Sequence, residues 1–352
     1  MKHRVWPVLA GIMMWALASG CGSDAAGGAE PGGTGGDAVG TGGADPGDPA
    51  SGGATTGGAG PGGAGGSATG GDTMGTGGFM GTCTPSESVP RNVSGSGPHE
   101  VVVETNPDPG ISEGTIFRPA DLGPGKDYPI VVWGNGACSR DGLSNEAAMA
   151  ELASHGYVVV ADGTPGGTEP NRPLGGGGEV LLAYVDWLIE ENDKPCSPYH
   201  QSLDATKVAA NGFSCGGLMA AGTAADPKMT TWGHMSSGSF AVDPAFYASI
   251  HTPVLIVTGT ADSLGAHENG QRDFDNISQR DDIPVMMFAK VGADHGGDLW
   301  APNGGHFTKI HLAWLNWWLK GDESATGKGL LVGGSCSYCS DPTWQIQSAN
   351  LP

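Results

Sequence analysis

Basic residues are scarce in this chain of 352 residues. Only 16 Lys and Arg stand against 37 Asp and Glu, which gives a formal net charge of −21 at pH 7. A surface this acidic repels the phosphates of nucleic acids and offers no polybasic attraction to anionic lipids. We therefore expect no nucleic-acid partner and favour a small or neutral substrate.

Lysine, arginine, leucine and isoleucine are all missing between Gly22 and Gly81, where 26 of the 60 residues are glycine. Such a segment cannot bury enough apolar surface to offset the entropy of ordering it, so it is not a packed domain. Its glycines do not recur at every third position, which excludes a collagen helix. We predict a disordered Gly-rich linker over residues 21–82 and one large folded domain over residues 83–352.

The apolar run from Val5 to Leu17 is too short to span a bilayer with ease, and it follows Lys2 and Arg4 as in an export signal. The segment ends in Leu17-Ala-Ser-Gly-Cys21, which resembles the lipobox of bacterial lipoproteins. In that family the cysteine is lipidated and becomes the mature N-terminus. The resemblance implies a signal peptide over residues 1–20, lipid attachment at Cys21, and a location in the cell envelope or outer membrane. An ordinary secretory signal is the alternative.

Export would place the six cysteines after Cys21 in an oxidising compartment, where they can form disulfides. Six cysteines allow 15 pairings, and sequence alone does not choose among them. Cys336-Ser-Tyr-Cys339 has the spacing of a redox motif or of half a zinc site, but no second pair follows it. We expect a structural disulfide between these two cysteines.

Short β-branched runs alternate with helical patterns in the predicted domain. The first two runs predict an antiparallel pair of strands, 99–104 and 114–119. Four brief apolar runs are typical of strands buried on both faces of a parallel sheet: 128–133, 157–161, 207–211 and 253–258. Helices are predicted near 145–154, 178–191 and 216–225, and a final helix ends at Lys320. The fold class is therefore α/β, with a mostly parallel central sheet and helices on both faces.

Gly212-Phe-Ser-Cys-Gly216 lies between a predicted strand and a predicted helix, which is the context of a nucleophile elbow with the pattern G-x-S-x-G. The glycines are needed because the turn is too sharp for side chains to clear. The turn raises the hydroxyl of Ser214 to the top of the sheet, where the strands have their carboxyl ends. The start of the next helix stabilises negative charge there. We therefore predict that Ser214 is a nucleophile rather than part of a structural glycine turn.

A serine nucleophile needs a histidine base, and the histidine needs a carboxylate that holds its tautomer. In the elbow arrangement the acid and then the base follow the serine along the chain. Asp262 follows the predicted strand 253–258, and His295 follows the run 283–290, which we take as the last strand. We predict Asp262 as the acid and His295 as the base. His306, at the start of the final helix, is the alternative base.

A metal site formed by Asp294, Asp298 and His306 is a further alternative, but the spacing matches no ligand pattern that we can defend. We therefore expect no metal and no organic cofactor. The remaining histidines that we considered are expected in packing or at the surface: His155, His234, His251 and His267.

The oxyanion that forms when the serine attacks needs two backbone N–H donors. One is expected from Cys215, directly after the nucleophile. The other is expected from the glycine-rich loop 134–138, where we favour Gly136 or its neighbour Ala137. If both loops line one oxyanion hole, Cys138 lies near Cys215, and a disulfide between them is our hypothesis.

The chain from Tyr128 to Asp322 resembles the α/β-hydrolase superfamily, in its dienelactone-hydrolase and cutinase-like branch of serine esterases. The resemblance implies ester hydrolysis through an acyl-enzyme. Dienelactone hydrolases proper use a cysteine nucleophile, whereas the elbow here holds Ser214, which favours the serine-esterase side. The matching stretches are 133–138, 152–160, 212–217, the Asp262 loop, 294–297 and 314–322.

Many hydrolases of this kind insert a helical lid before the strand that carries the acid. Only twelve residues separate Ser236–Phe240 from Pro253, so we expect no lid domain. An open site suits a bulky or polymeric ester. We expect a monomeric serine esterase outside the cytoplasm, attached to the membrane through its lipid. A catalytically inactive surface binding protein and a serine peptidase, both on the same fold, are the alternatives.

Overall fold

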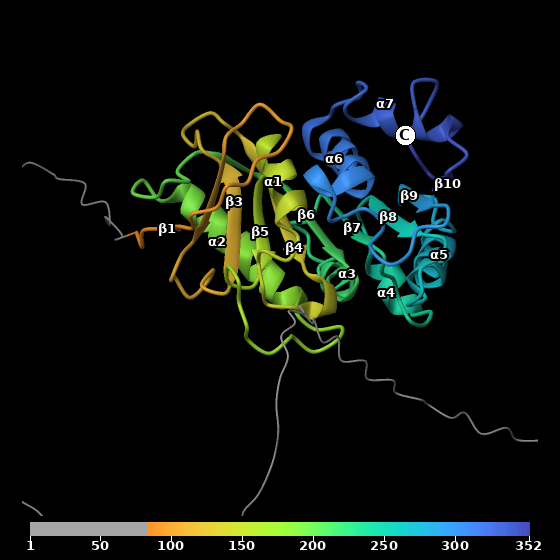
Figure 1. Ribbon diagram of the computed structural model, residues 1–352, viewed down its shortest axis with the longest axis horizontal. Coiled ribbons are helices and arrows are strands. Elements are labelled where there is room, and N and C mark those ends of the chain that lie inside the picture. The colour runs from red at the N-terminus through yellow and green to blue at the C-terminus, as the bar shows by residue number, and fades with distance from the viewer. Residues whose placement is uncertain (1–82) are drawn as a thin grey trace, which may run out of the picture. The chain divides into compact units, whose positions relative to one another are not determined.

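A ten-stranded sheet forms the centre of residues 83–352, which are the residues that the computed structural model describes (Figure 1). The predicted signal peptide, Cys21 and the linker lie outside the described residues. The strand order is β1-β2-β3-β5-β4-β6-β7-β8-β9-β10. The strands are β1 (Glu87–Ser88), β2 (Val101–Thr105), β3 (Gly114–Pro119), β4 (Tyr128–Gly134), β5 (Val158–Asp162), β6 (Leu203–Phe213), β7 (Thr231–Met235), β8 (Val254–Gly259), β9 (Val285–Lys290) and β10 (Trp344–Ala349).

The strands from β5 through β9 are parallel, whereas β1, β2 and β3 pair antiparallel at one edge and β10 pairs antiparallel with β9 at the other. The antiparallel pairing of β2 with β3 was predicted and is confirmed. The run 283–290 is a strand, but the expectation that it is the last one is wrong, because β10 follows it. The sequence of β10, WQIQSA, has polar residues at half of its positions and only one β-branched residue, which concealed it.

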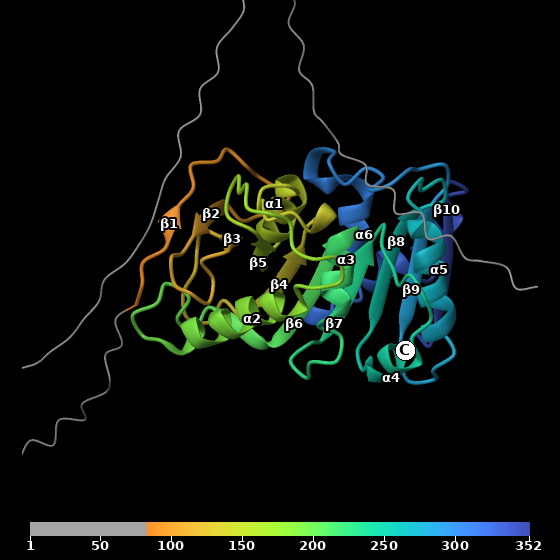
Figure 2. The same ribbon diagram turned by 90° about the horizontal axis from the view of Figure 1, so that it is seen from below.

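Helices cover both faces of the sheet, as predicted (Figure 2). The alternation of β4 shows the two layers: Ile130 and Val132 pack in the core under α2, α3 and α5, and Val131 and Trp133 pack in the core under α1 and α6. The helices are α1 (Glu146–Ser154), α2 (Gly178–Asp193), α3 (Cys215–Ala221), α4 (Pro244–Ser249), α5 (Ala266–Ile277), α6 (Gly305–Lys320) and α7 (Lys328–Leu331), with short 3₁₀ turns η1 (Gly136–Cys138), η2 (Pro302–Gly304) and η3 (Tyr338–Ser340).

Three disulfides join the six cysteines of the described residues: Cys83–Cys196, Cys138–Cys215 and Cys336–Cys339. The second and third of these bonds confirm the two pairings that the sequence suggested. Disulfides form and persist in oxidising compartments, so the protein belongs outside the cytoplasm. Within residues 83–352, no helix is both long and apolar enough to cross a membrane.

Candidate active site

Ser214 lies at the sharp turn between β6 and α3. Its backbone has φ 54° and ψ −123°, a conformation that few residues with a side chain adopt. The turn is possible because its flanking residues are glycines: a Cβ on Gly212 would overlap the carbonyl of Gly216, and a Cβ on Gly216 would overlap the carbonyl of Gly134. The N–H of Ser214 donates to the carbonyl of Met235 at 2.9 Å, which fixes the turn against β7.

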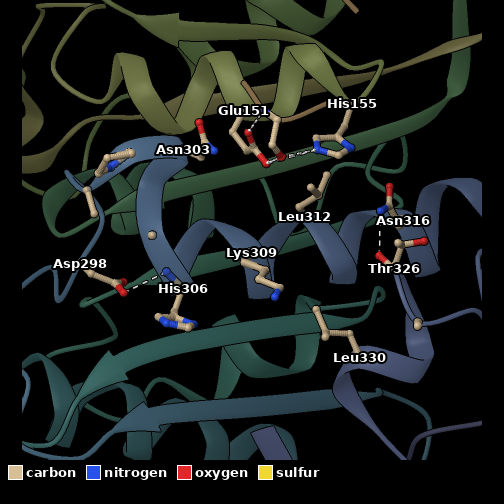
Figure 3. Close-up of a pocket in the computed structure, with 15 residues that line it drawn as sticks. Glu151, His155, Asp298, Asn303, His306, Lys309, Leu312, Asn316, Thr326 and Leu330 are labelled. Carbon is tan, nitrogen blue, oxygen red and sulfur yellow. Dashed lines mark hydrogen bonds and ion pairs between the residues drawn. The ribbon is translucent and has the colours of Figure 1, made fainter. Parts of the chain in front are cut away.

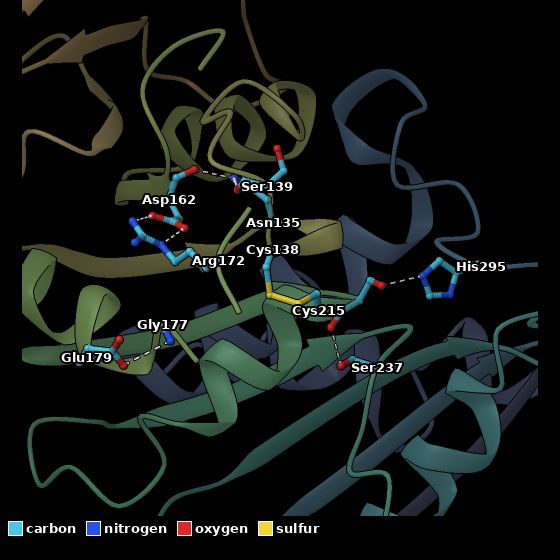
Figure 4. Close-up of a disulfide and its surroundings, with 11 residues drawn as sticks. Asn135, Cys138, Ser139, Asp162, Arg172, Gly177, Glu179, Cys215, Ser237 and His295 are labelled. Carbon is cyan, nitrogen blue, oxygen red and sulfur yellow. Dashed lines mark hydrogen bonds and ion pairs between the residues drawn. A yellow bond between two sulfur atoms is a disulfide. The ribbon is translucent and has the colours of Figure 1, made fainter. Parts of the chain in front are cut away.

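The three residues predicted as nucleophile, base and acid lie within hydrogen-bond distance of one another. His295 Nε2 lies 2.9 Å from Ser214 Oγ (Figure 4). On its other side, His295 Nδ1 lies 2.9 Å from Asp262 Oδ2 and 3.1 Å from Asp262 Oδ1. The Asp262 side chain is fully buried, while the imidazole is 18% exposed. The carboxylate is therefore shielded from water, and the hydroxyl and imidazole face an accessible surface.

Asp262 is oriented by the loop that carries it, directly after β8. Its Oδ1 accepts the backbone N–H of Leu264 at 3.0 Å and that of Ala266, the first residue of α5, at 3.3 Å. These donors hold the carboxylate in the orientation in which Oδ2 makes the shorter of its two contacts with His295 Nδ1. The arrangement favours an imidazole whose Nδ1 carries the proton and whose Nε2 is free to accept one from Ser214.

Asp294 has a structural role that the sequence did not reveal. Its Oδ1 accepts the backbone N–H of Ser263 at 2.8 Å and that of His295 at 2.7 Å. These backbone hydrogen bonds, first that from Ser263, lower the pKa of Asp294. The only sequence signal for this role is an aspartate directly before the histidine, which by itself also fits a metal ligand.

His306 lies elsewhere, in the first turn of α6, and Asp298 lies in the loop before that helix. Asp298 accepts the backbone N–H groups of His306 at 2.9 Å and of Phe307 at 3.1 Å, as a helix cap does. The imidazole of His306 lies 3.0 Å from the hydroxyl of Tyr338. These contacts account for both residues by capping and packing, and His295, not His306, is the histidine within hydrogen-bond distance of Ser214.

Two serines after β7 support the elbow and were missed by sequence reasoning. Ser237 Oγ donates to the carbonyl of Ser214 at 2.6 Å (Figure 4). Ser236 Oγ accepts the N–H of Gly296 at 2.9 Å, which holds the residue after His295. Their only sequence signal is a pair of small polar residues at the carboxyl end of a central strand.

The two loops proposed to supply oxyanion donors meet at Ser214. Cys215 is the first residue of α3, so its N–H has no partner within the helix. On the facing loop, Ala137 lines the same pocket as Ser214 and Cys215. Gly136 packs instead against the ring of Phe213, where an added Cβ would lie 2.6 Å from the ring. Of the two candidates in this loop, Ala137 is the one that borders the pocket.

The pocket at Ser214 has a volume of about 330 Å³ and an apolar rim. Leu174, Phe240 and Leu264 line it and are 65%, 64% and 70% exposed. Between β7 and β8 the chain forms only the six-residue helix α4, so this part of the described structure has no lid domain. The pocket therefore opens directly to the surface.

A buried ion pair supports one wall of this pocket. Both oxygens of Asp162, which is fully buried, accept hydrogen bonds of 2.7 Å from the Arg172 guanidinium (Figure 4). This contact with Asp162 raises the pKa of Arg172. Tyr184 Oη donates to the same carboxylate at 2.9 Å, and the backbone N–H of Arg172 donates to the carbonyl of Cys138 at 2.9 Å. The pair thereby anchors the loop that carries Ala137.

A second cavity, of about 610 Å³, lies beside α1 and α6 (Figure 3). None of the residues around Ser214 lines it. Its buried carboxylate, Glu151, accepts the N–H and the hydroxyl of Ser96 at 2.7 and 2.6 Å and lies 3.2 Å from His155 Nε2. These contacts tie the segment before β2 to α1, and we interpret the cavity as part of that packing.

An open, mostly parallel sheet with helices on both faces and a serine on a strand-to-helix elbow defines an α/β-hydrolase. A family model described as PET hydrolase-like matches residues 80–328. The chain therefore belongs to the PET hydrolase-like family, and it is a hydrolase that acts on esters. A comparison with curated proteins found no match.

Proposed function

We propose that the protein is an extracytoplasmic serine esterase that works through an acyl-enzyme, with Ser214 as nucleophile, His295 as general base and Asp262 as the acid that orients the histidine. The observation that supports this assignment is the continuous hydrogen-bonded chain from Ser214 Oγ through both nitrogens of His295 to the buried Asp262. Each group has the partner that its role requires.

The reaction proposed for this chain has two halves. As Ser214 Oγ attacks the ester carbonyl, His295 Nε2 takes its proton and then gives it to the departing alcohol. Asp262 stabilises the imidazolium meanwhile. The negative charge on the carbonyl oxygen is held by the N–H groups of Cys215 and Ala137. Water then attacks the acyl-enzyme with His295 again as base, which releases the acid and restores Ser214.

The substrate proposed is a bulky or polymeric ester. The pocket is open, and its exposed apolar side chains, Leu174, Phe240 and Leu264, suit a large apolar chain that lies across the surface. A substrate that had to be enclosed would need a cover over this rim. The family description, PET hydrolase-like, agrees with a polymeric ester.

The location proposed follows from the sequence features. Residues 1–20 are proposed as a signal peptide, Cys21 as the lipid-attachment site, residues 21–82 as the linker and residues 83–352 as a monomeric catalytic domain. Mass spectrometry of the membrane fraction tests this directly: an acylated Cys21 peptide supports the anchor. Release of Cys21→Ala into the soluble fraction is the matching functional result.

Fluorophosphonate labelling combined with hydrolysis of p-nitrophenyl acyl esters and of a polyester film tests the enzyme assignment. The wild type should label and turn over, and Ser214→Ala should lose labelling and at least about 10,000-fold in kcat. Ser249→Ala, which changes an exposed serine in α4, is the matched control. Labelling or full activity of Ser214→Ala would remove Ser214 as the nucleophile.

A further inference from the structure

The Cys138–Cys215 disulfide joins the two loops that carry the proposed oxyanion donors. Cys215 is itself one of the proposed donors, and Cys138 directly follows Ala137, the other proposed donor. Cys138 has no exposed surface, and Cys215 is 9% exposed and lines the pocket. The bond therefore lies at the wall of the site (Figure 4).

The loop on the Cys138 side has an unusual backbone. Ala137 has φ 56° and Cys138 has φ 51°, so two consecutive residues with a Cβ occupy the left-handed region. Residues other than glycine adopt this conformation at a cost, and they stay in it only when their surroundings fix it. The direction of the Ala137 N–H depends on this backbone conformation.

Two kinds of contact fix the loop. Asn135 Nδ2 donates to the carbonyls of Ser139 and Asp141, both at 3.1 Å, and the carbonyl of Cys138 accepts the N–H of Arg172. These hydrogen bonds hold the loop to itself and to the segment that follows β5. The disulfide is different, because it ties the loop covalently to the first residue of α3, next to the nucleophile.

We propose that the Cys138–Cys215 disulfide sets the spacing of the two oxyanion donors, which makes both cysteines positioning residues of the esterase reaction proposed above. With the bond intact, Ala137 is held in its left-handed conformation and its N–H is directed toward the carbonyl oxygen that Ser214 attacks. Without the bond, Ala137 relaxes toward an ordinary backbone conformation and its N–H turns away. Chemistry slows, while substrate binding at the apolar rim is unchanged.

Paired alanine variants separate this role from stabilisation. Cys138→Ala/Cys215→Ala removes a bond with a sequence separation of 77, and the control, Cys83→Ala/Cys196→Ala, removes one with a separation of 113. Loops of these lengths give comparable stabilisation, so both variants should lose comparable thermal stability. Only the first should lose kcat, by about 100-fold, the lower end of the cost of losing one oxyanion donor. Its KM should stay within about twofold of wild type.

A thionoester substrate distinguishes positioning of the donors from mere stabilisation of the fold, because a loss of stability alone would not change the ratio of kcat for an oxygen ester to kcat for its thionoester. The sulfur anion that forms from a C=S group is a weaker hydrogen-bond acceptor than an oxyanion, so correctly placed donors favour the oxygen ester. The ratio of kcat for p-nitrophenyl acetate to that for its thionoester should therefore be high in the wild type and in the Cys83→Ala/Cys196→Ala control. It should fall at least about tenfold in Cys138→Ala/Cys215→Ala.

If Cys138→Ala/Cys215→Ala does not fold, chemical reduction of the Cys138–Cys215 disulfide gives the same test. Tris(carboxyethyl)phosphine gives two electrons to the S–S bond, water supplies two protons and the oxygen atom, and two thiols and a phosphine oxide result. The reagent is added to folded Cys83→Ala/Cys196→Ala, and alkylation with mass mapping reports when the thiol of Cys138 appears. Loss of kcat should follow the fraction of Cys138 thiol while circular dichroism stays unchanged.

The outcomes separate this inference from the proposed function. An unlabelled and inactive wild type would overturn the esterase assignment itself. An active wild type with an inactive Ser214→Ala, together with full kcat in Cys138→Ala/Cys215→Ala, would overturn only the role of the disulfide. Equal losses of kcat in both disulfide variants, or an unchanged oxygen-to-sulfur ratio, would also overturn it.

Discussion

Asp294 Oδ1 accepts the backbone N–H of Ser263 at 2.8 Å, which joins the loop after β8 to the loop after β9. Each partner is adjacent in sequence to a residue of the proposed catalytic set: Ser263 follows Asp262, and Asp294 precedes His295. The contact is therefore one of the links that fix the relative position of the proposed acid and the proposed base.

Removing the carboxylate of Asp294 should lower kcat clearly while it changes the free energy of unfolding only slightly. Asp294→Ala removes this side-chain link, while the N–H of Ala261 still donates to the carbonyl of Ala293 at 3.0 Å. His295 therefore loses part of its alignment, and we expect kcat to fall about tenfold with KM nearly unchanged. Asp294→Asn keeps a side-chain oxygen acceptor and should retain most of the activity. Steady-state kinetics on a soluble ester measure both variants. Equal activity of Asp294→Ala and the wild type would contradict the positioning role.

Phe240 should matter for large substrates and not for small ones. Phe240→Ser removes an exposed apolar side chain from the pocket rim, so hydrolysis of a polyester film should fall by about three- to tenfold because less apolar surface is buried on contact. Hydrolysis of p-nitrophenyl acetate should stay within about twofold of wild type. Val291→Ser is the control, since Val291 is 48% exposed and does not line the pocket. A parallel loss on both substrates would show that Phe240 acts on the chemistry instead.

Breaking the Asp162–Arg172 pair should destabilise the domain strongly. Arg172→Met leaves a fully buried carboxylate with only Tyr184 and its backbone surroundings, and we expect a loss of about 3 kcal/mol in the free energy of unfolding. Glu323→Ala breaks an ion pair whose carboxylate is 72% exposed, and it should cost less than about 1 kcal/mol. Urea denaturation gives both values. Similar costs would show that burial does not govern the strength of these pairs.

His311 should account for part of the loss of stability in acid. Neither of its ring nitrogens has a hydrogen-bond partner among the described residues, and burial lowers its pKa from 6.5 to about 3. Between these values the unfolded chain binds a proton that the folded protein excludes, so stability falls as the pH falls below 6.5. The slope is about 1.4 kcal/mol per pH unit.

His311→Leu removes that slope. Between pH 7 and pH 5 the variant should lose about 2 kcal/mol less than the wild type, measured by urea denaturation at each pH. His251→Gln is the control for the removal of an imidazole as such, because His251 is exposed. A wild-type slope in His311→Leu would mean that the buried imidazole does not titrate in this range.

Asp262 and His295 were predictable because, in this fold, the acid and then the base follow the serine along the chain. Parallel strands place the loops at their carboxyl ends on one side of the molecule, so a serine elbow after β6, an aspartate after β8 and a histidine after β9 are brought together. The Cys138–Cys215 pairing followed from the same reasoning. The Cys83–Cys196 pairing did not, because no site brings those two cysteines together and their positions depend on how the chain packs at the sheet edge.

Parts of the fold were hidden because their sequences lack the usual strand signal. β7 has the sequence TWGHM, and its glycine is required because a Cβ on Gly233 would lie 2.6 Å from the carbonyl oxygen of Leu255. The close packing between central strands therefore requires glycine at position 233, where a β-branched residue would have marked the strand. Ser236 and Ser237 were hidden for a related reason, since their function is to hold backbone groups that come from distant loops.

The Cys83–Cys196 bond also determines how the domain would bear a mechanical load. A pull on the chain ahead of Cys83 reaches this covalent link, near the end of α2, before it reaches β1. The pairing of β1 with β2 has only two residues on each side, and it would peel first if it carried the force. The disulfide carries the tension to the segment between α2 and β6, so the two-residue pairing of β1 with β2 does not bear it.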